Sequence, residues 1–103
     1  MPAQVLTAGS SITSPNGAFN LVMQGDGNLV EYTSAGGVVW AANTSGNPGA
    51  YVVMQSDGNL VVYSSANAPL WASGTSGQPG AYLSLSDTGS LQIGLGATTI
   101  WVA

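Results

Sequence analysis

The sequence predicts an all-β domain, and three observations support this class. Apolar runs are short and rich in Val, Leu, Tyr and Trp, and clusters of Gly, Asn, Asp, Ser and Pro separate them, as expected for strands and turns. No segment shows the sustained 3.6-residue apolar period of an amphipathic helix. The third observation is an internal repeat with an offset of 31 residues, which organises nearly the whole chain.

The repeat divides residues 1–103 into three units, and we expect them to form a single domain. Residues 46–77 align without gaps over residues 77–103 at this offset, with the final Trp one place early. The same offset relates Gln24 to Gln55 and Trp40 to Trp71. We therefore expect three repeats, at about 14–45, 46–76 and 77–103, the last of them divergent.

Within the middle repeat, "AYVVMQ" predicts a strand, "SDGN" a tight turn, "LVVYSS" the returning strand, and "ANAP" a second turn before "LWASGT". Asp-Gly fits a hairpin tip because glycine accepts positive φ without steric cost and Asp bonds its local backbone. The first repeat has the same corner, since "GDGNLVEY" (25–32) matches "SDGNLVVY" (56–63). Each repeat is thus expected to begin with a hairpin.

One hairpin buries too little apolar surface to fold alone, so the three repeats must share a core. A closed, roughly three-fold assembly of small antiparallel sheets satisfies this requirement. Each repeat contains one tryptophan after an apolar residue, and we expect the three rings to meet near the axis. The expected core thus includes Trp40, Trp71 and Trp101. It also includes five residues at the beginnings or ends of the predicted strands: Phe19, Met23, Tyr51, Met54 and Tyr82.

The charge composition excludes several classes of partner. The 103 residues contain four acids and no Lys, Arg or His, which gives a net charge of −4. Binding to nucleic acid or to anionic membranes requires cations, so we expect neither, and no segment is long and apolar enough for membrane insertion. The amino terminus lacks the basic start and apolar run of a signal peptide, and the sequence assigns no location. The expected ligand is a neutral molecule or a cation.

The repeated corner contains more than a turn requires. Five positions spaced by two residues recur, and side chains at this spacing share one face of a strand. Together they provide two amides, a carboxylate, a phenol and an aliphatic wall, a mixture that suits the hydroxyls and C–H face of a neutral sugar. The two sets are Gln24, Asp26, Asn28, Val30 and Tyr32, and Gln55, Asp57, Asn59, Val61 and Tyr63.

"QGDGNLVEY" and "QSDGNLVVY" match the Gln-x-Asp-x-Asn-x-Val-x-Tyr motif, and the chain resembles the monocot mannose-binding (bulb-type, snowdrop-type) lectins along nearly its whole length. The resemblance implies a β-prism II of three four-stranded sheets and a metal-free mannose site in each repeat, open to glycans outside the cell or on its surface. It assigns the sugar's 3-hydroxyl side to Gln24 and Gln55, the axial 2-hydroxyl to Asp26, Asn28, Asp57 and Asn59, the 4-hydroxyl to Tyr32 and Tyr63, and the ring carbons to Val30 and Val61.

The third repeat departs from the motif, and we expect its site to be degenerate. Its five positions hold Ser86, Thr88, Ser90, Gln92 and Gly94, so both the carboxylate and the phenol are missing. Asp87 stands one place out of register, where only a shifted hairpin would use it. In the first repeat, we expect Glu31 to lie beside the pocket and to weaken or redirect binding there. The second site is therefore the better candidate.

The alternatives to a sugar-binding role are a calcium site, an enzyme and a protein-interaction scaffold. Each corner has one carboxylate, or two if Glu31 turns in, which is too few for calcium. The chain lacks His, Cys and Lys, and the paired carboxylates of a glycosidase are absent, so we expect no enzyme. A β-prism used for protein interaction or self-assembly stays open. From the resemblance we also expect a homodimer, formed by the apolar C-terminal segment "ATTIWVA" crossing into a partner subunit.

Overall fold

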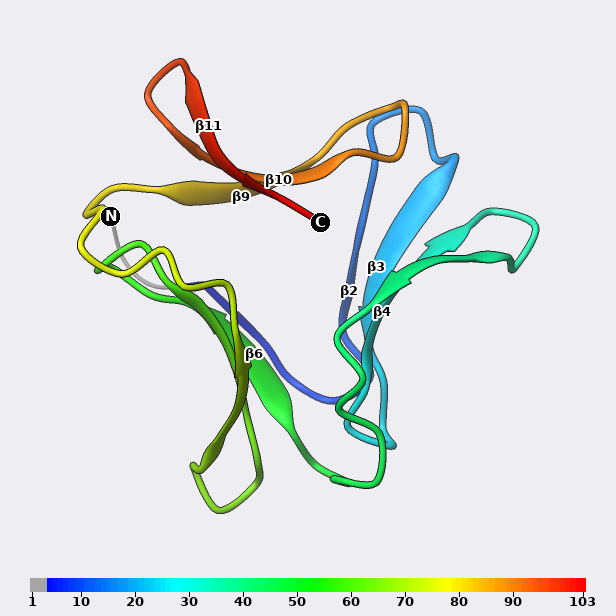
Figure 1. Ribbon diagram of the computed structural model, residues 1–103. Coiled ribbons are helices and arrows are strands. Elements are labelled where there is room, and N and C mark those ends of the chain that lie inside the picture. Colours follow the sequence, from blue (N-terminus) through cyan, green and yellow to red (C-terminus); the bar gives the residue numbers. More distant parts are fainter. Residues whose placement is uncertain (1–3) are drawn as a thin grey trace.

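A computed structural model describes residues 4–103, which form strands and turns only (Figure 1). No helix in this range is long and apolar enough to cross a membrane. The strands are β1 (Gln4–Leu6), β2 (Ser11–Thr13), β3 (Phe19–Met23), β4 (Leu29–Thr33), β5 (Val38–Ala41), β6 (Tyr51–Met54), β7 (Leu60–Tyr63), β8 (Pro69–Ala72), β9 (Tyr82–Leu85), β10 (Leu91–Leu95) and β11 (Thr98–Val102).

The strands form three antiparallel sheets around a common axis, and this confirms the predicted β-prism (Figure 1). The first sheet has the order β2-β3-β4-β5, the second β1-β6-β7-β8 and the third β9-β10-β11. The two N-terminal strands β1 and β2 supply the fourth strands of the second and first sheets. The third sheet thus has three strands within residues 4–103, where the resemblance implied four.

The repeated corner is a hairpin tip, as predicted. In the first hairpin, Met23 pairs with Leu29, and the Gln24 N–H donates to the Asn28 carbonyl at 2.9 Å. Gly27 has φ of 94°, and a Cβ there would lie 2.2 Å from the carbonyl oxygen of Asn47. Only glycine fits this close backbone approach, which recurs between Gly58 and Gln78 in the second repeat.

The core lies between the inner faces of the three sheets. Met23 and Met54 are buried there as predicted, and Phe19 packs against the same cluster. The prediction was wrong for Tyr51 and Tyr82, which lie on the outer faces. Side chains alternate along a strand, so burial of Val52 and Met54 directs Tyr51 outward, and Tyr82 follows the same pattern.

The three tryptophans meet, as predicted, at one end of the prism. Trp40, Trp71 and Trp101 lie on β5, β8 and β11, which are the last strands of their sheets. The ring centroids are 5.3, 5.8 and 5.6 Å apart, and each pair is packed edge to face. This geometry is favourable for aromatic rings and closes that end of the core.

The C-terminal strand pairs within the described chain, and its expected crossing into a partner subunit stays a prediction. β11 pairs with β10, with Gln92 opposite Val102 and Ile93 opposite Trp101. The pairing places Trp101 in the same trio as the other two tryptophans. The strand therefore completes the fold of a single chain.

Glu31 lies inside the prism, and the expectation that it borders the first pocket was wrong. It is 1% exposed, and the inward position that it occupies on β4 corresponds to Val62 on β7. Its Oε2 atom has no hydrogen-bond partner among the described residues. Alternation along β4 explains this placement, because the outward side chains Val30 and Tyr32 flank Glu31 on both sides.

Candidate functional site

The first two hairpin corners each bring the five predicted residues together on the outer face of a sheet. In the first, Gln24 follows β3, and its Nε2 donates a hydrogen bond to the hydroxyl of Tyr32 on β4. Gln55 and Tyr63 make the equivalent bond in the second. The carboxylates of Asp26 and Asp57 are exposed at the tips. The remaining polar members of both sets are half-buried: Gln24, Asn28, Tyr32, Gln55, Asn59 and Tyr63.

The two valines form the floors of these pockets. Val30 is 2% exposed and Val61 is 3% exposed, although both point to the outer face. Their cross-strand neighbours cover them; Val30 lies between Val22 and Ala41 in the register of the first sheet. Each valine therefore offers a ligand only a small apolar surface between the polar groups.

The aspartates have both a turn function and a free acceptor. Oδ1 of Asp26 accepts the Asn28 backbone N–H at 2.9 Å, and Oδ1 of Asp57 accepts that of Asn59 at 3.0 Å. In the described residues, Oδ2 of neither side chain accepts a hydrogen bond. Because an ionised carboxylate only accepts, each tip presents one free acceptor to solvent.

The asparagines are oriented by their own hydrogen bonds. Oδ1 of Asn28 accepts the Thr44 N–H at 3.1 Å. Oδ1 of Asn59 accepts from the Ser73 hydroxyl and from the N–H groups of Gly74 and Thr75, at 3.1 to 3.2 Å. Since the amide oxygen is occupied, the Nδ2 donor is the group left for a ligand. Each pocket thus has a fixed donor beside a fixed acceptor.

Our sequence interpretation missed the supporting residues Thr44 and Thr75. Their hydroxyls are buried and donate to the carbonyls of Gly27 and Gly58, both at 2.6 Å. These bonds tie the hairpin tip to the loop that follows the tryptophan strand. The signal was present, because "TSGNPGA" and "TSGQPGA" recur at the repeat offset.

The two pockets differ beside the tyrosine. Tyr63 stacks on Tyr51 across the β6–β7 pair, with centroids 5.6 Å apart and ring planes at 25°. The Tyr51 hydroxyl donates to Oδ1 of Asn67. In the first pocket, Asn20 stands opposite Tyr32 instead. The second tyrosine is therefore held by an aromatic neighbour that the first lacks.

The third corner has the same register but different chemistry. The Ser86 N–H donates to the Ser90 carbonyl at 3.0 Å, so Asp87 is not shifted into the motif position and instead accepts the Asn16 N–H at 2.8 Å. The side chains at the motif positions bond one another: Ser86 with Thr88 at 2.9 Å, and Gln92 with Ser90 at 2.6 Å.

The ring of Tyr82 lies over Gly94, which holds the position of the motif tyrosine. A Cβ on Gly94 would lie 2.8 Å from the ring of Tyr82, whose hydroxyl donates to the Gly96 carbonyl at 3.0 Å. The outer face that receives Tyr32 and Tyr63 in the other repeats is thus covered by another side chain. A tyrosine at position 94 would have to displace it.

The acidic groups do not form a metal cluster. Among residues 4–103, no group of three or more His, Cys, Asp or Glu side chains is placed to hold an ion. Each of the two complete corners has one carboxylate, and Glu31 lies in the core. The site chemistry is therefore that of neutral hydrogen bonding around a single anionic acceptor.

Comparisons with known proteins indicate similarity to lectins. No protein-family model matches the sequence. No curated protein matches it either. Solved structures do: a monomeric mannose-binding lectin from the monocot Gastrodia elata is 37% identical with a TM-score of 0.86, over 96% of this chain and 89% of that one.

Two further lectin structures agree with this result. A lectin from Allium sativum is 38% identical with a TM-score of 0.82, over 99% of this chain and 95% of that one. The snowdrop (Galanthus nivalis) agglutinin, solved with methyl-α-D-mannoside, is 37% identical with a TM-score of 0.72, over 91% of this chain and 90% of that one. With this identity along nearly its full length, the chain belongs to the monocot mannose-binding, or bulb-type, lectin family.

Proposed function

We propose that residues 1–103 form one lectin domain of three repeats that binds mannose or mannose-containing glycans through the first two pockets. The observation that carries the proposal is the repeated pair of free groups at each tip, the Asp Oδ2 acceptor and the Asn Nδ2 donor. A sugar hydroxyl both donates and accepts, so one hydroxyl satisfies both groups. The snowdrop agglutinin, whose structure contains a mannoside, supports the choice of sugar.

The roles implied by the family motif suit the hydrogen bonds that remain free. The axial 2-hydroxyl would bond Asp26 and Asn28 in the first pocket, and the 4-hydroxyl would bond Tyr32. Gln24 would keep its Oε1 acceptor for the 3-hydroxyl side, because its Nε2 bonds Tyr32. Val30 would form the floor under the ring carbons. The second pocket would use the corresponding residues, and the third would be degenerate.

Binding would require no metal and would lead to no reaction. Asp26 and Asp57 lie in different sheets, one in each pocket, so no pair of carboxylates flanks a glycosidic bond. A shallow site for one sugar predicts an affinity of about 1 mM, or about −4 kcal/mol. Useful avidity would come from engaging two pockets on one branched glycan.

Substitution of the two tip carboxylates tests the proposal. Asp26→Asn with Asp57→Asn removes the free acceptors, while the amide oxygens can still accept the turn N–H bonds. We expect methyl α-mannoside binding to fall at least about tenfold by NMR titration. Asp87→Asn is the control, since it removes a single carboxylate that lies outside both pockets. Equal binding by all three proteins would contradict the role given to the two carboxylates, and no binding by the wild type would leave the alternative, a prism used for protein interaction.

A homodimer through the C-terminal strand remains part of the proposal. Because β11 pairs within its own chain, a dimer would form by exchange of β11 between two copies, each strand taking the place of the other. Exchange would double the number of sugar sites in one particle. Sedimentation at increasing concentration measures this directly, and a single monomeric species throughout would contradict it.

A further inference from the structure

Within residues 4–103, the third sheet has a free edge where the other two sheets have a fourth strand. Among residues 4–103, no strand pairs with β9 on the side away from β10. In the second sheet, β1 covers the equivalent edge, with Leu6 opposite Val52. In the first sheet, β2 covers it, with Ile12 opposite Leu21. Leu83 corresponds to Val52 and Leu21 at the repeat offset. The first two sheets therefore indicate that a strand with an aliphatic side chain fits beside Leu83.

The missing strand leaves the inner face of β9 incompletely covered. Leu21 is fully buried and Val52 is 2% exposed, whereas Leu83 is only half-buried. Leu6 on β1 and Ile12 on β2 pack against the core at the edges next to Val52 and Leu21. In the described part of the chain, no corresponding aliphatic side chain covers the third sheet.

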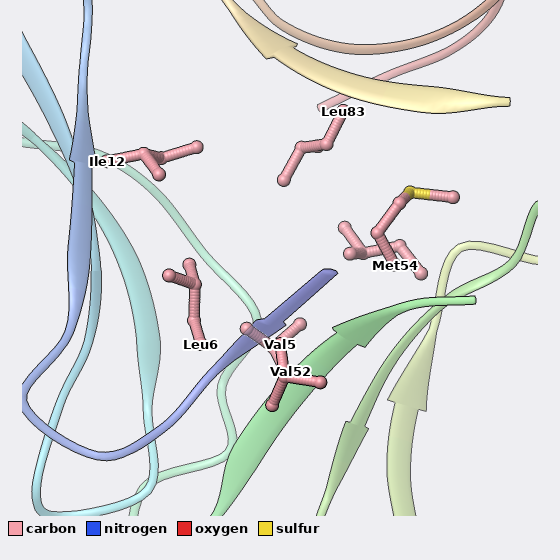
Figure 2. A pocket seen from close by; sticks show the side chains of 7 residues that line it. Val5, Leu6, Ile12, Val52, Met54 and Leu83 are labelled. Atoms are coloured by element: carbon pink, nitrogen blue, oxygen red, sulfur yellow. The ribbon is translucent and has the colours of Figure 1, made fainter. Parts of the chain in front are cut away.

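A cavity of about 340 Å³ lies at this position. The seven side chains that line it are all apolar, and Figure 2 shows Leu83, Ile12, Leu6, Val52 and Met54 around it. It lies among β1, β2, β6, β7 and β9, whereas the three tryptophans lie on β5, β8 and β11, the opposite edge strands of the sheets. One end of the prism is thus closed by aromatic rings, and the other is open at one of its three sides.

The shape of the opening selects a single extended segment. β1 and β2 extend their sheets by one strand beyond the level of β9, so the vacant place is a notch one strand wide, about 4.8 Å. A second prism paired through its own β9 would have to accommodate β1 and β2 of both copies beside the paired edges. A single extended segment meets no such requirement and is the occupant that the notch favours.

The charge of the chain further restricts which segments can bind beside β9. β9 has the sequence YLSL and carries no charge, while the whole chain has a net charge of −4 and no cation. This negative charge attracts a basic segment, has little effect on a neutral one and repels an acidic one.

We propose that the notch beside β9 is an acceptor site for an extended, neutral or basic segment of a partner protein. The segment pairs antiparallel with β9 and places a leucine- or isoleucine-sized side chain into the cavity beside Leu83. Backbone hydrogen bonds along the edge provide the affinity, and the cavity selects the side chain. The site is separate from the two sugar pockets, which lie at the outer hairpin tips.

A peptide that copies β1 is the probe, because β1 makes this pairing in the second sheet. We would titrate acetylated, amidated AQVLTA with an added C-terminal lysine into the labelled protein and record NMR spectra. We expect saturable shifts of the amides of Tyr82–Leu85 and of the methyl groups of Leu83 and Ile12 at low-millimolar peptide. Saturating methyl α-mannoside should not change them.

Two N-methylated peptides serve as matched controls. Methyl groups on the amides that face β9 should weaken binding at least about tenfold, and methyl groups on the opposite amides should not. Replacing the peptide's leucine with aspartate should also abolish binding. These changes leave the protein intact, so a folding defect cannot explain them.

Three results would overturn the proposal. The first is an absence of saturable shifts. The second is a set of shifts at Val52–Met54, which would mean that the peptide displaces β1 from β6. The third is a concentration-dependent shift of β9 without peptide, which would identify the occupant as a second copy of this chain.

Discussion

The buried carboxyl of Glu31 provides a direct test of how this core is built. Its side chain is 1% exposed, Oε2 has no hydrogen-bond partner among residues 4–103, and the sequence contains no Lys, Arg or His to pair with it. The equivalent position in the second repeat holds Val62, which is fully buried. We predict that Glu31→Val increases the free energy of unfolding.

The size of the effect follows from the environment. A buried polar atom without a partner costs about 1–3 kcal/mol, so Glu31→Val should stabilise the protein by about this amount at acid pH, where the carboxyl is neutral. Burial raises the pKa of Glu31 above its ordinary value of 4.5. Above that value the unfolded chain releases its proton first, so stability falls by up to about 1.4 kcal/mol per pH unit until the pH reaches the folded-state pKa.

Urea denaturation followed by tryptophan fluorescence measures both effects. Wild type, Glu31→Gln and Glu31→Val should be compared at a series of pH values below and above 4.5, the ordinary pKa of a Glu side chain. We expect the advantage of both variants to grow as the pH rises through the window above 4.5. Parallel curves for the three proteins, or a loss of stability in Glu31→Val, would refute the reasoning.

Three further predictions concern close contacts. Gly58→Ala should cost about 3 kcal/mol or more, because its Cβ would lie 2.2 Å from the Gln78 carbonyl oxygen, whereas Gly36→Ala, with similar φ but open space, should cost about 1 kcal/mol in the same urea assay. Thr75→Val removes the 2.6 Å bond to the Gly58 carbonyl and should cost about 1–2 kcal/mol by thermal denaturation. Gly94→Ala should destabilise by about 1–3 kcal/mol, and most of this loss should vanish in a Tyr82→Ala background, as a double-mutant cycle would show.

Much of the fold could be predicted because local and global signals agree. The Asp-Gly corners determine the hairpins, and two-residue spacing places the motif side chains on one face, as the structure shows for Gln24 and Tyr32. The repeat also predicted the meeting of the three tryptophans, since one ring per repeat must lie near a three-fold axis. The first two features depend on residues close together in the chain, and the third depends on the repeat itself.

The wrong predictions concern side chains whose direction follows from the inward–outward alternation along a strand. Glu31 lies between the outward side chains Val30 and Tyr32 and therefore had to point inward, although its charge suggested the surface. Tyr51 and Tyr82 align with Asn20 at the repeat offset, and this polar counterpart indicates the outer face. Edge pairing was harder to foresee, because the short segments at 4–6 and 11–13 do not show which sheets they will join.

The central claim is that two pockets bind mannose without metal and that the third does not. The most direct test is a titration of the labelled protein with methyl α-mannoside in EDTA, followed by NMR residue by residue. We expect saturable amide shifts at residues 24–32 and 55–63, with residues 86–94 unchanged. No shifts at tens of millimolar sugar, roughly tenfold above the expected dissociation constant, would contradict it, and so would equal shifts at all three corners.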